Sequence, residues 1–478
     1  MSPNNKEHPQ DIFLNVTLTF FAVFFLSMFC WAAHYSLALP LLLLFLGVHL
    51  HFFKKANVKL FLDLGLLLTV IMFGTHAVSQ YTNWPPYYIP VAAIGMLTML
   101  LFNDLQLVFM MSLISSLFVS LIVNGDFGMM ITFFVGGLTG AYSVKDTRNR
   151  GQLMNAGLFV SIISVVSIVL LHPDVNVILT KDFVANYLYP TALNGFISVF
   201  VVLATLKIFE FLFGVVTNFS LLELSDFNQP LLKKMILEAP GTYHHSLVVS
   251  NLAEAAAEAI GANSLLARVG AYYHDIGKIA KPQYFTENQL VGGNKHDDLE
   301  PTISRLVVLN HVKEGSELAK KYHLNSVIID FIPQHHGTSL MHYFYQRALE
   351  EVDSDNPVRE EDFRYPGPKP QNRETAIVML ADSAEGATRS LDEHNSNTIA
   401  DTVQKIINNK FIDGQLDECN LNLKDIEKIS EAFVRILSAM YHGRVKYPEK
   451  KNGSHSKKSS EKGAPQLAPD YPNHKDNS

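Results

Sequence analysis

The stretch Tyr272-Tyr273-His274-Asp275-Ile276-Gly277-Lys278 places a histidine and an aspartate side by side at the end of an apolar helical run. Further ligand-type side chains surround this pair along the second half of the chain: His244, His245, His311, His335, His336 and Asp382. A single histidine on a helix is most often structural, but this many at the ends or inner faces of successive helices favours a metal site. Imidazole and carboxylate together suit Fe, Mn, Zn or Ni.

The adjacent histidine and aspartate are useful for two metal ions, because a carboxylate has two oxygens and can bridge while the imidazole binds one ion. Two ions about 3.5–4 Å apart can hold a phosphate and share a hydroxide nucleophile. Zinc-finger spacing and the H-E-x-x-H pattern are both absent from the sequence.

The composition is divided between two halves of the 478-residue chain. The first half is dominated by Leu, Phe, Val, Ile and Met, whereas most charged residues lie in the second, so the mean hydropathy of +0.14 averages two different regions. A net charge of −7 gives no sign of a surface for a nucleic-acid polymer. The two cysteines, Cys30 and Cys419, offer no disulfide framework.

Eight apolar segments in the first half approach the length of about 20 residues that spans a bilayer. They lie at about 12–34, 37–53, 59–77, 87–103, 105–124, 127–144, 155–172 and 189–215. The run from 87 to 124 is interrupted only by Asn103-Asp104, and we interpret it as two helices joined by a tight turn. A count of seven spans remains open. No signal-peptide pattern leads the first segment, which we expect to be retained.

The loops between these segments predict the orientation in the membrane. Basic residues cluster at 54–59 and at 145–150, and short loops rich in Lys and Arg stay in the cytoplasm. Both clusters and the second half of the chain then lie on the cytoplasmic side. The carboxylates Asp63, Asp104 and Glu210 lie near segment ends, where a structural role is more common than an ion pathway. Gly136, Gly137 and Gly140 suit close helix packing.

Residues 216–239 connect the halves. Ser220-Leu221-Leu222-Glu223 has the form of a capping box, which predicts a helix start at Ser220, and Pro230 breaks or restarts the helix. The segment is either a plain tether or a coupling element that passes the state of the membrane or of a dimer to the second half. The pattern leaves both open.

The second half shows helical periodicity and little strand signal. Helices are expected at about 242–260, ending before Gly261; from Asn263 or Ser264 to the His-Asp pair; at 302–322; from Asn325 to the second histidine pair; at 373–391; and as a last pair up to about His442. An acidic and then Pro-rich loop covers 351–371, and 446–478 is predicted to be a disordered tail. The fold class is therefore all-α: a polytopic transmembrane bundle followed by a helical domain over 240–445.

Three strings carry a resemblance to a known family: Glu238-Ala239-Pro240-Gly241-Thr242-Tyr243-His244-His245-Ser246, Tyr273-His274-Asp275-Ile276-Gly277-Lys278 and Gln334-His335-His336-Gly337-Thr338. They resemble the HD-domain phosphohydrolase superfamily, and within it the seven-transmembrane HD family of bacterial cyclic di-AMP phosphodiesterases, the PgpH type. The resemblance extends from the HD domain at about 238–445 into the membrane half.

The resemblance implies two divalent ions, iron or manganese, bridged by Asp275. The first ion would be held by His245, His274, Asp275 and Asp382, and the second by Asp275, His311, His335 and His336. His244 has no implied role. Family members usually carry an extracytoplasmic domain between the first helix and a seven-helix block, whereas here only a few residues around Tyr35 join the first two segments. We therefore expect that domain to be missing.

The leading hypothesis is a phosphodiesterase, multi-pass in the bacterial inner membrane, that hydrolyses cyclic di-AMP to 5′-pApA in second-messenger signalling. Catalysis is assigned to His274, Asp275 and Lys278. Lys278, one helical turn after His274, is also expected to contact a phosphate oxygen, with Arg305 and Tyr284 as further substrate contacts. No general acid is evident. A homodimer, hydrolysis of another nucleotide such as cyclic di-GMP or a guanine nucleotide, and a receptor that binds nucleotide without turnover all remain open.

Overall fold

The computed structural model describes residues 47, 58–125, 127–172, 174–289, 295–350 and 358–441. The described part of the chain is helical, and its one β-bridge pairs Leu340 with Arg364 outside any strand. This confirms the all-α prediction. The first two expected apolar segments and the predicted tail lie outside the described residues, as does part of the 351–371 loop.

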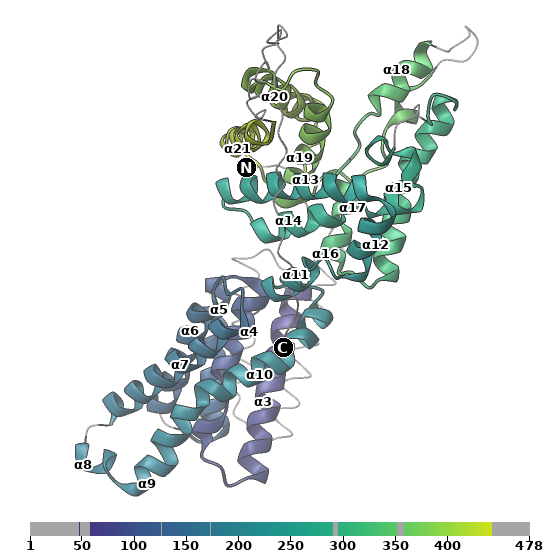
Figure 1. Ribbon diagram of the computed structural model, residues 1–478. Coiled ribbons are helices and arrows are strands. Elements are labelled where there is room, and N and C mark those ends of the chain that lie inside the picture. The colour runs from purple at the N-terminus through teal and green to yellow at the C-terminus, as the bar shows by residue number, and fades with distance from the viewer. Residues whose placement is uncertain are drawn as a thin grey trace, which may run out of the picture.

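The membrane half is a bundle of apolar helices that extends away from the helical domain (Figure 1). Its elements are α3 (Val58–Tyr81), η1 (Pro86–Tyr88), α4 (Ala92–Phe102), α5 (Leu105–Ile122), α6 (Phe127–Val144), α7 (Arg150–Leu171), the short α8 (Val175–Ile178) and α9 (Lys181–Phe183), η2 (Val184–Leu188) and α10 (Tyr189–Phe213). Five of the described helices are long and apolar enough to cross a membrane, and Pro86–Phe102 is a shorter apolar helix. These correspond to the third to eighth expected segments.

The interruption at Asn103-Asp104 is a tight turn, as predicted. Asn103 adopts the left-handed conformation with φ +47°, and the side chain of Asp104 accepts hydrogen bonds from the N–H groups of Gln106 and Leu107 at 2.9 and 3.1 Å. Asp104 is therefore the N-cap of α5. A structural role accounts for this carboxylate near the membrane.

Close helix packing in the bundle depends on glycine. A Cβ atom on Gly95 would lie 2.4 Å from the carbonyl oxygen of Gly137, so α4 and α6 approach through their backbones, as the Gly136-Gly137 pattern predicted. A second such contact was not predicted from the sequence: a Cβ on Gly195 of α10 would lie 2.0 Å from the carbonyl oxygen of Gly157 on α7.

The junction consists of α11 (Asn218–Leu224) and α12 (Pro230–Glu238). The predicted capping box is wrong, because α11 begins two residues before Ser220. Glu210 of α10 supplies the cap instead: its buried carboxylate accepts hydrogen bonds from the backbone N–H and hydroxyl of Thr217, and from Ser220 Oγ at 2.7 Å. Pro230 does start a new helix, as expected from its fixed φ.

The helical domain packs around two apolar cores and contains most of the remaining helices: α13 (Pro240–Ala259), α14 (Ser264–Tyr273), η3 (Ile276–Ala280), η4 (Pro282–Tyr284), η5 (Thr286–Asn288), α15 (Pro301–Lys321), α16 (Ser326–Ile329), α17 (Phe331–Gln334), α18 (His342–Glu350), η6 (Glu360–Phe363), α19 (Arg373–Arg389), α20 (Ser396–Ile412) and α21 (Leu423–Tyr441). Asn263 caps α14 through Leu266 N, and Gly261 with φ +65° follows α13, both as predicted. The helix expected from Asn325 to the histidine pair is instead divided into α16 and α17.

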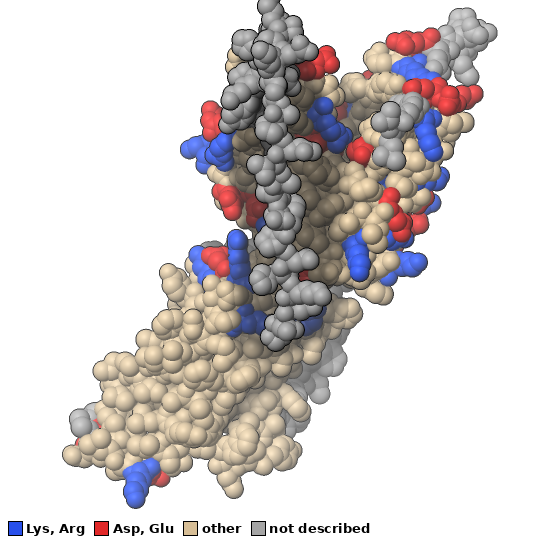
Figure 2. Space-filling model, viewed as in Figure 1, with Lys and Arg blue, Asp and Glu red and all other residues tan. Residues whose placement is uncertain are grey.

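The charge distribution separates the two halves of the molecule. Charged side chains gather on the helical domain and at the end of the bundle nearest to it, and the visible side of the bundle is otherwise mostly uncharged until its far tip (Figure 2). The helical domain contacts the junction and the end of the bundle directly as well as through the chain. Tyr273 Oη donates to the carbonyl of Leu224 at 2.8 Å, and Asn325 Nδ2 donates to the carbonyl of Val215 at 3.2 Å.

Candidate metal centre

Five helices and the loops at their ends bring together the ligand-type side chains. His245 lies on α13, His274 ends α14, His311 lies on α15, the histidine pair follows α17, and Asp382 lies on α19. Two groups can each place one ligand atom per residue within 4.8 Å of one another: His245, His274, Asp275 and Asp382, and Asp275, His311, His335 and His336. Asp275 belongs to both groups, and these are the two sets that the resemblance implies.

The two carboxylate oxygens of Asp275 face different histidines. Oδ2 lies 3.6 Å from His245 Nε2 and 3.2 Å from His274 Nε2. Oδ1 lies 3.4 Å from His311 Nε2 and 3.6 Å from His335 Nε2. Because each oxygen points into one set, a single carboxylate can bridge two ions.

The histidines are oriented through their second ring nitrogen. Nδ1 of His274 donates to the carbonyl of Ala271 at 2.7 Å, and Nδ1 of His335 donates to that of Phe331 at 3.1 Å. His311 Nδ1 likewise pairs with the carbonyl of Val308. In the neutral ring, each bond keeps the proton on Nδ1 and leaves the lone pair on Nε2, which is the arrangement that metal-ligating histidines adopt.

Several buried polar atoms at the centre of the cluster lack a hydrogen-bond partner among the described residues: His274 Nε2, His311 Nε2, His335 Nε2 and Asp275 Oδ1. A buried polar atom without a partner costs free energy. Their chemistry and their convergence fit divalent metal ions, which would satisfy them together. The donor set of imidazole and carboxylate suits Fe, Mn, Zn or Ni.

Burial and neighbouring charges shift the pKa values of several of these side chains. Burial lowers the pKa of His335 to about 3, and it also holds the pKa of His336 well below its usual value, so both imidazoles are neutral at neutral pH. Burial opposes ionisation of Asp275, but Lys278 and His274 outweigh it and hold the pKa of this carboxyl well below its ordinary value. The Asp275 carboxylate is therefore charged at neutral pH.

Close backbone contact aligns the His-Asp turn with α15. A Cβ atom on Gly277 would lie 1.8 Å from the carbonyl oxygen of His311. Only glycine allows η3 and α15 to approach this closely. The glycine two residues after Asp275 thus places His311 beside the Asp275 carboxylate.

Two further carboxylates, Glu385 and Glu287, contact the cluster and were not predicted from the sequence. Glu385 lies three residues after Asp382 on α19, so the two carboxylates share a helix face, and its Oε2 is 2.6 Å from His245 Nδ1. Glu287 Oε1 accepts a hydrogen bond from Lys278 Nζ at 2.8 Å. The same ammonium group lies 2.7 Å from Asp275 Oδ2. The i, i+3 spacing was a signal for Glu385, but nothing in the local sequence links Glu287 to Lys278.

The residues predicted to contact the substrate each pack against or pair with another side chain of the protein. Lys278 is part of the cluster through Asp275, and its ammonium also lies 5.0 Å from the ring centroid of Phe285. Arg305 packs over Phe363, and Tyr284 packs against His296. The assignment of Arg305 and Tyr284 to the substrate stays a prediction. His244, which had no implied role, is exposed.

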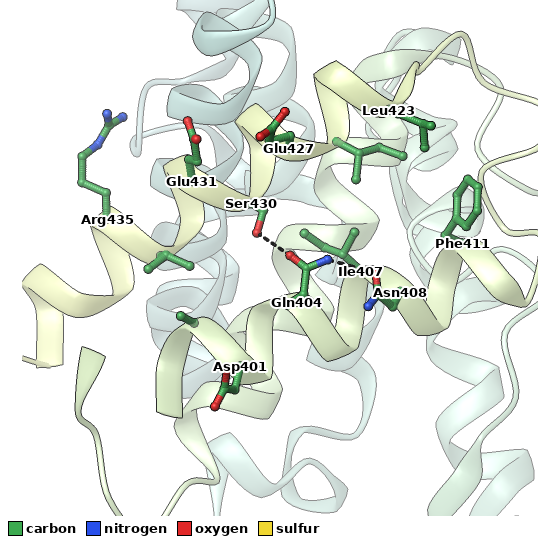
Figure 3. A pocket seen from close by; sticks show the side chains of 13 residues that line it. Asp401, Gln404, Ile407, Asn408, Phe411, Leu423, Glu427, Ser430, Glu431 and Arg435 are labelled. Carbon is green, nitrogen blue, oxygen red and sulfur yellow. Dashed lines mark hydrogen bonds between the residues drawn. The ribbon is translucent and has the colours of Figure 1, made fainter. Parts of the chain in front are cut away.

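A groove in the helical domain lies apart from the cluster. This groove of about 820 Å³ runs between α20 and α21 and is lined by residues that include Gln404, Phe411 and Leu423 (Figure 3). Gln404 spans it, accepting from Ser430 Oγ at 3.5 Å and donating to Asn408 at 2.9 Å. None of the ligand-type residues of the two sets lines this groove, so the metal chemistry lies elsewhere.

Comparison with known proteins agrees with this architecture. Residues 34–217 match the family described as 7TM receptor with intracellular HD hydrolase, and residues 242–387 match the HD domain. Together with the apolar helices, these matches identify a multi-pass membrane protein whose HD domain carries His/Asp clusters for divalent metal.

Two curated relatives are cyclic-di-AMP phosphodiesterases named PgpH. The one from Bacillus subtilis is 39% identical over 83% of this chain and 56% of its own length, and the one from Listeria monocytogenes is 38% identical over 82% and 54%. The chain thus spans about half the length of the curated relatives it matches. A crystal structure of the L. monocytogenes PgpH HD domain in complex with cyclic-di-AMP is 49% identical, with a TM-score of 0.44, and covers 45% of this chain and 100% of that one. The chain belongs to the family of 7TM receptors with an intracellular HD hydrolase.

Proposed function

We propose that this protein is a membrane-anchored, metal-dependent phosphodiesterase that hydrolyses cyclic di-AMP to 5′-pApA. The observation that carries the proposal is the division of the Asp275 carboxylate between two histidine sets. The curated relatives that match most of this chain are cyclic-di-AMP phosphodiesterases, which supports the choice of substrate.

Each set would hold one divalent ion, manganese or iron. His245, His274, Asp275 and Asp382 would bind the first, and Asp275, His311, His335 and His336 the second. Two such ions, when bound, supply the Lewis acidity that activates water and neutralises the charge of a phosphodiester. Hydrolysis forms one bond from water oxygen to phosphorus, breaks the bond from phosphorus to the 3′ oxygen, and delivers a proton to that oxygen.

The residues around the ions position and charge the site. Lys278 is held between Asp275 and Glu287 at 2.7 and 2.8 Å, so its ammonium balances the carboxylates and lies beside the first set. The backbone and carboxylate acceptors of the histidines keep each Nε2 directed inward. We assign no general acid, because no side chain is placed to protonate the leaving oxygen by the contacts described above.

We further propose that the protein lies in the bacterial inner membrane with its HD domain in the cytoplasm. Thr147, in the basic loop between α6 and α7, accepts from Asn218 Nδ2 of the junction at 3.5 Å, so this loop lies at the end of the bundle that faces the HD domain. Basic loops favour the cytoplasmic side.

The proposed divisions of the chain are a membrane region over 1–215, a linker over 216–239, the HD domain over 240–445 and a tail over 446–478. A homodimer stays a prediction that molecular mass in detergent solution tests.

The test is an assay of the purified full chain, loaded with Mn²⁺, against cyclic di-AMP and cyclic di-GMP. We expect turnover of cyclic di-AMP with 5′-pApA as the product, and loss of activity on metal chelation. Turnover of cyclic di-GMP alone would overturn the substrate, and binding of either nucleotide without turnover would favour a receptor.

A further inference from the structure

Lys410 lies in the last turn of α20, and its ammonium group reaches the turn that follows the histidine pair. Its Nζ donates to Ser339 Oγ at 2.7 Å, and the backbone N–H of Ser339 donates to the carbonyl of His336 at 3.1 Å. The side chain is only partly exposed. An ammonium group carries three donors, and this is the one hydrogen bond that the Lys410 ammonium makes in the described part of the chain.

The charge of Lys410 is not neutralised by a neighbouring carboxylate. Within the described residues, no salt bridge joins its Nζ to an acidic oxygen, and the two carboxylates that act on it most strongly are engaged elsewhere. Asp382 contacts His245 at 3.0 Å, and Asp413 contacts Arg364 at 2.8 Å. Burial lowers the pKa of Lys410. A desolvated ammonium without a counter-charge costs free energy, and a bound anion relieves that cost.

The position of Lys410 is next to the second metal set. The carbonyl of Ser339 accepts from the backbone N–H of Tyr365 at 3.1 Å, and the Tyr365 ring stacks on the ring of His336 with centroids 4.1 Å apart. Lys410, Ser339 and Tyr365 therefore adjoin the His336 end of the cluster. Lys278, by contrast, lies against the Oδ2 atom of Asp275, which faces the first set.

A cyclic dinucleotide carries two phosphodiesters, and only one can be cleaved at the metal cluster in a single event. We propose that Lys410 binds the second, uncleaved phosphodiester, with the hydroxyl of Ser339 orienting the ammonium and donating its own hydrogen to the same anion. This inference rests on the proposed function and names the subsite that distinguishes a cyclic dinucleotide from a substrate with one phosphodiester.

The experiment compares wild-type full chain with Lys410→Met on two substrates. Loss of a charge-assisted hydrogen bond is expected to raise KM for cyclic di-AMP about 10- to 100-fold. Bis(p-nitrophenyl) phosphate has a single phosphodiester and does not reach the proposed subsite. Its kcat/KM is therefore expected to change by less than about twofold. Lys410→Arg, which keeps the charge, is expected to recover much of the affinity. Lys405→Met removes an exposed lysine of the same helix and serves as the matched control.

An unchanged KM for cyclic di-AMP in Lys410→Met would overturn the subsite, and so would an equal loss on both substrates or a loss of bound metal, because each indicates a structural role. Calorimetric binding of cyclic di-AMP to both proteins separates this inference from the proposed function. If wild type binds without turnover, the proposed function fails. The subsite then stands only if Lys410→Met weakens that binding.

Discussion

Nδ1 of His245 lies 2.6 Å from Oε2 of Glu385, and both side chains are buried. The other ring nitrogen of His245 faces Asp382 at 3.0 Å and Asp275 at 3.6 Å. A carboxylate behind a ligating imidazole fixes its orientation and raises its basicity. Glu385 therefore positions His245 without itself belonging to either set of candidate ligands.

Replacing Glu385 by alanine tests this role. We expect Glu385→Ala to lower the affinity for Mn²⁺ about 10- to 100-fold, because His245 loses the acceptor that orients it. Metal titration calorimetry measures the change. Glu393→Ala removes an exposed carboxylate in the loop after α19 and provides the control. A folded Glu385→Ala protein with wild-type Mn²⁺ affinity would contradict the positioning role.

Removing the bridge should affect both ions together. Asp275→Ala is expected to lose both metals and all measurable turnover, because this carboxylate is the one side chain common to the two sets. Elemental analysis of the purified protein gives the metal content, alongside the cyclic di-AMP assay. His244→Ala, at an exposed neighbour of the ligand His245, is the control. Retention of even one ion at full occupancy would argue against bridging.

The glycine that follows the His-Asp pair is expected to be intolerant of a side chain. Gly277→Ala places a Cβ 1.8 Å from the carbonyl oxygen of His311, so η3 must move away from α15. We expect a loss of stability of about 1–3 kcal/mol, as for overpacking in a core, together with weaker metal binding. Thermal unfolding and metal titration measure the two effects.

Gly386→Ala on α19 is the matched control for that substitution, because nothing lies within 4 Å of its added Cβ. Alanine is the better helix former, so stability should rise by up to about 1 kcal/mol. Equal melting temperatures for the two glycine variants would show that the backbone contact does not set the position of the His-Asp turn.

Metal affinity is expected to depend on pH. Burial acts to lower the pKa of His274, but Asp275 and Asp382 outweigh it and raise the pKa to about 10. An imidazole binds a metal ion only when its Nε2 is deprotonated, so below this pKa the ion must displace a proton from His274. The affinity for Mn²⁺ should therefore rise about tenfold per pH unit for each proton displaced. The imidazolium itself stabilises the metal-free fold below its unfolded pKa of 6.5, an effect lost as pH rises through about 10.

Calorimetry of Mn²⁺ binding between about pH 6 and about pH 8, in buffers of different ionisation enthalpy, counts the protons released. An affinity that stays constant over this range would show that His274 is already neutral before the ion binds.

A substitution at Glu210 tests whether the junction is a plain tether or a coupling element. Glu210 caps α11 through Thr217 N at 3.1 Å and Ser220 Oγ at 2.7 Å. Glu210→Ala removes the acceptor of the buried Thr217 N–H, which costs about 1–3 kcal/mol locally, so hydrogen exchange in 217–224 should become faster. A fall in turnover with unchanged metal content would support coupling. Unchanged turnover despite faster exchange would identify a plain tether.

Local sequence patterns predicted much of this protein. The spacing of apolar residues gave the described membrane helices, and Asn103-Asp104 was recognisable as a turn because asparagine tolerates the left-handed conformation and aspartate caps a helix. The capping box at Ser220 was misread, because the true cap comes from Glu210, ten residues earlier in the chain and on another helix. A side chain that arrives from a different element leaves no mark on the local pattern.

The sequence by itself determined the helical class, the membrane half and the identity of the candidate ligands, since periodicity and ligand chemistry are properties of residues close together in the chain. Only the tertiary structure decided which oxygen of Asp275 faces which histidines, that Glu287 restrains Lys278, and that Lys410 adjoins His336. Those relationships join atoms from different helices. They depend on how the helices pack, for example on the contact that Gly277 permits with α15, and local periodicity contains no information about such packing.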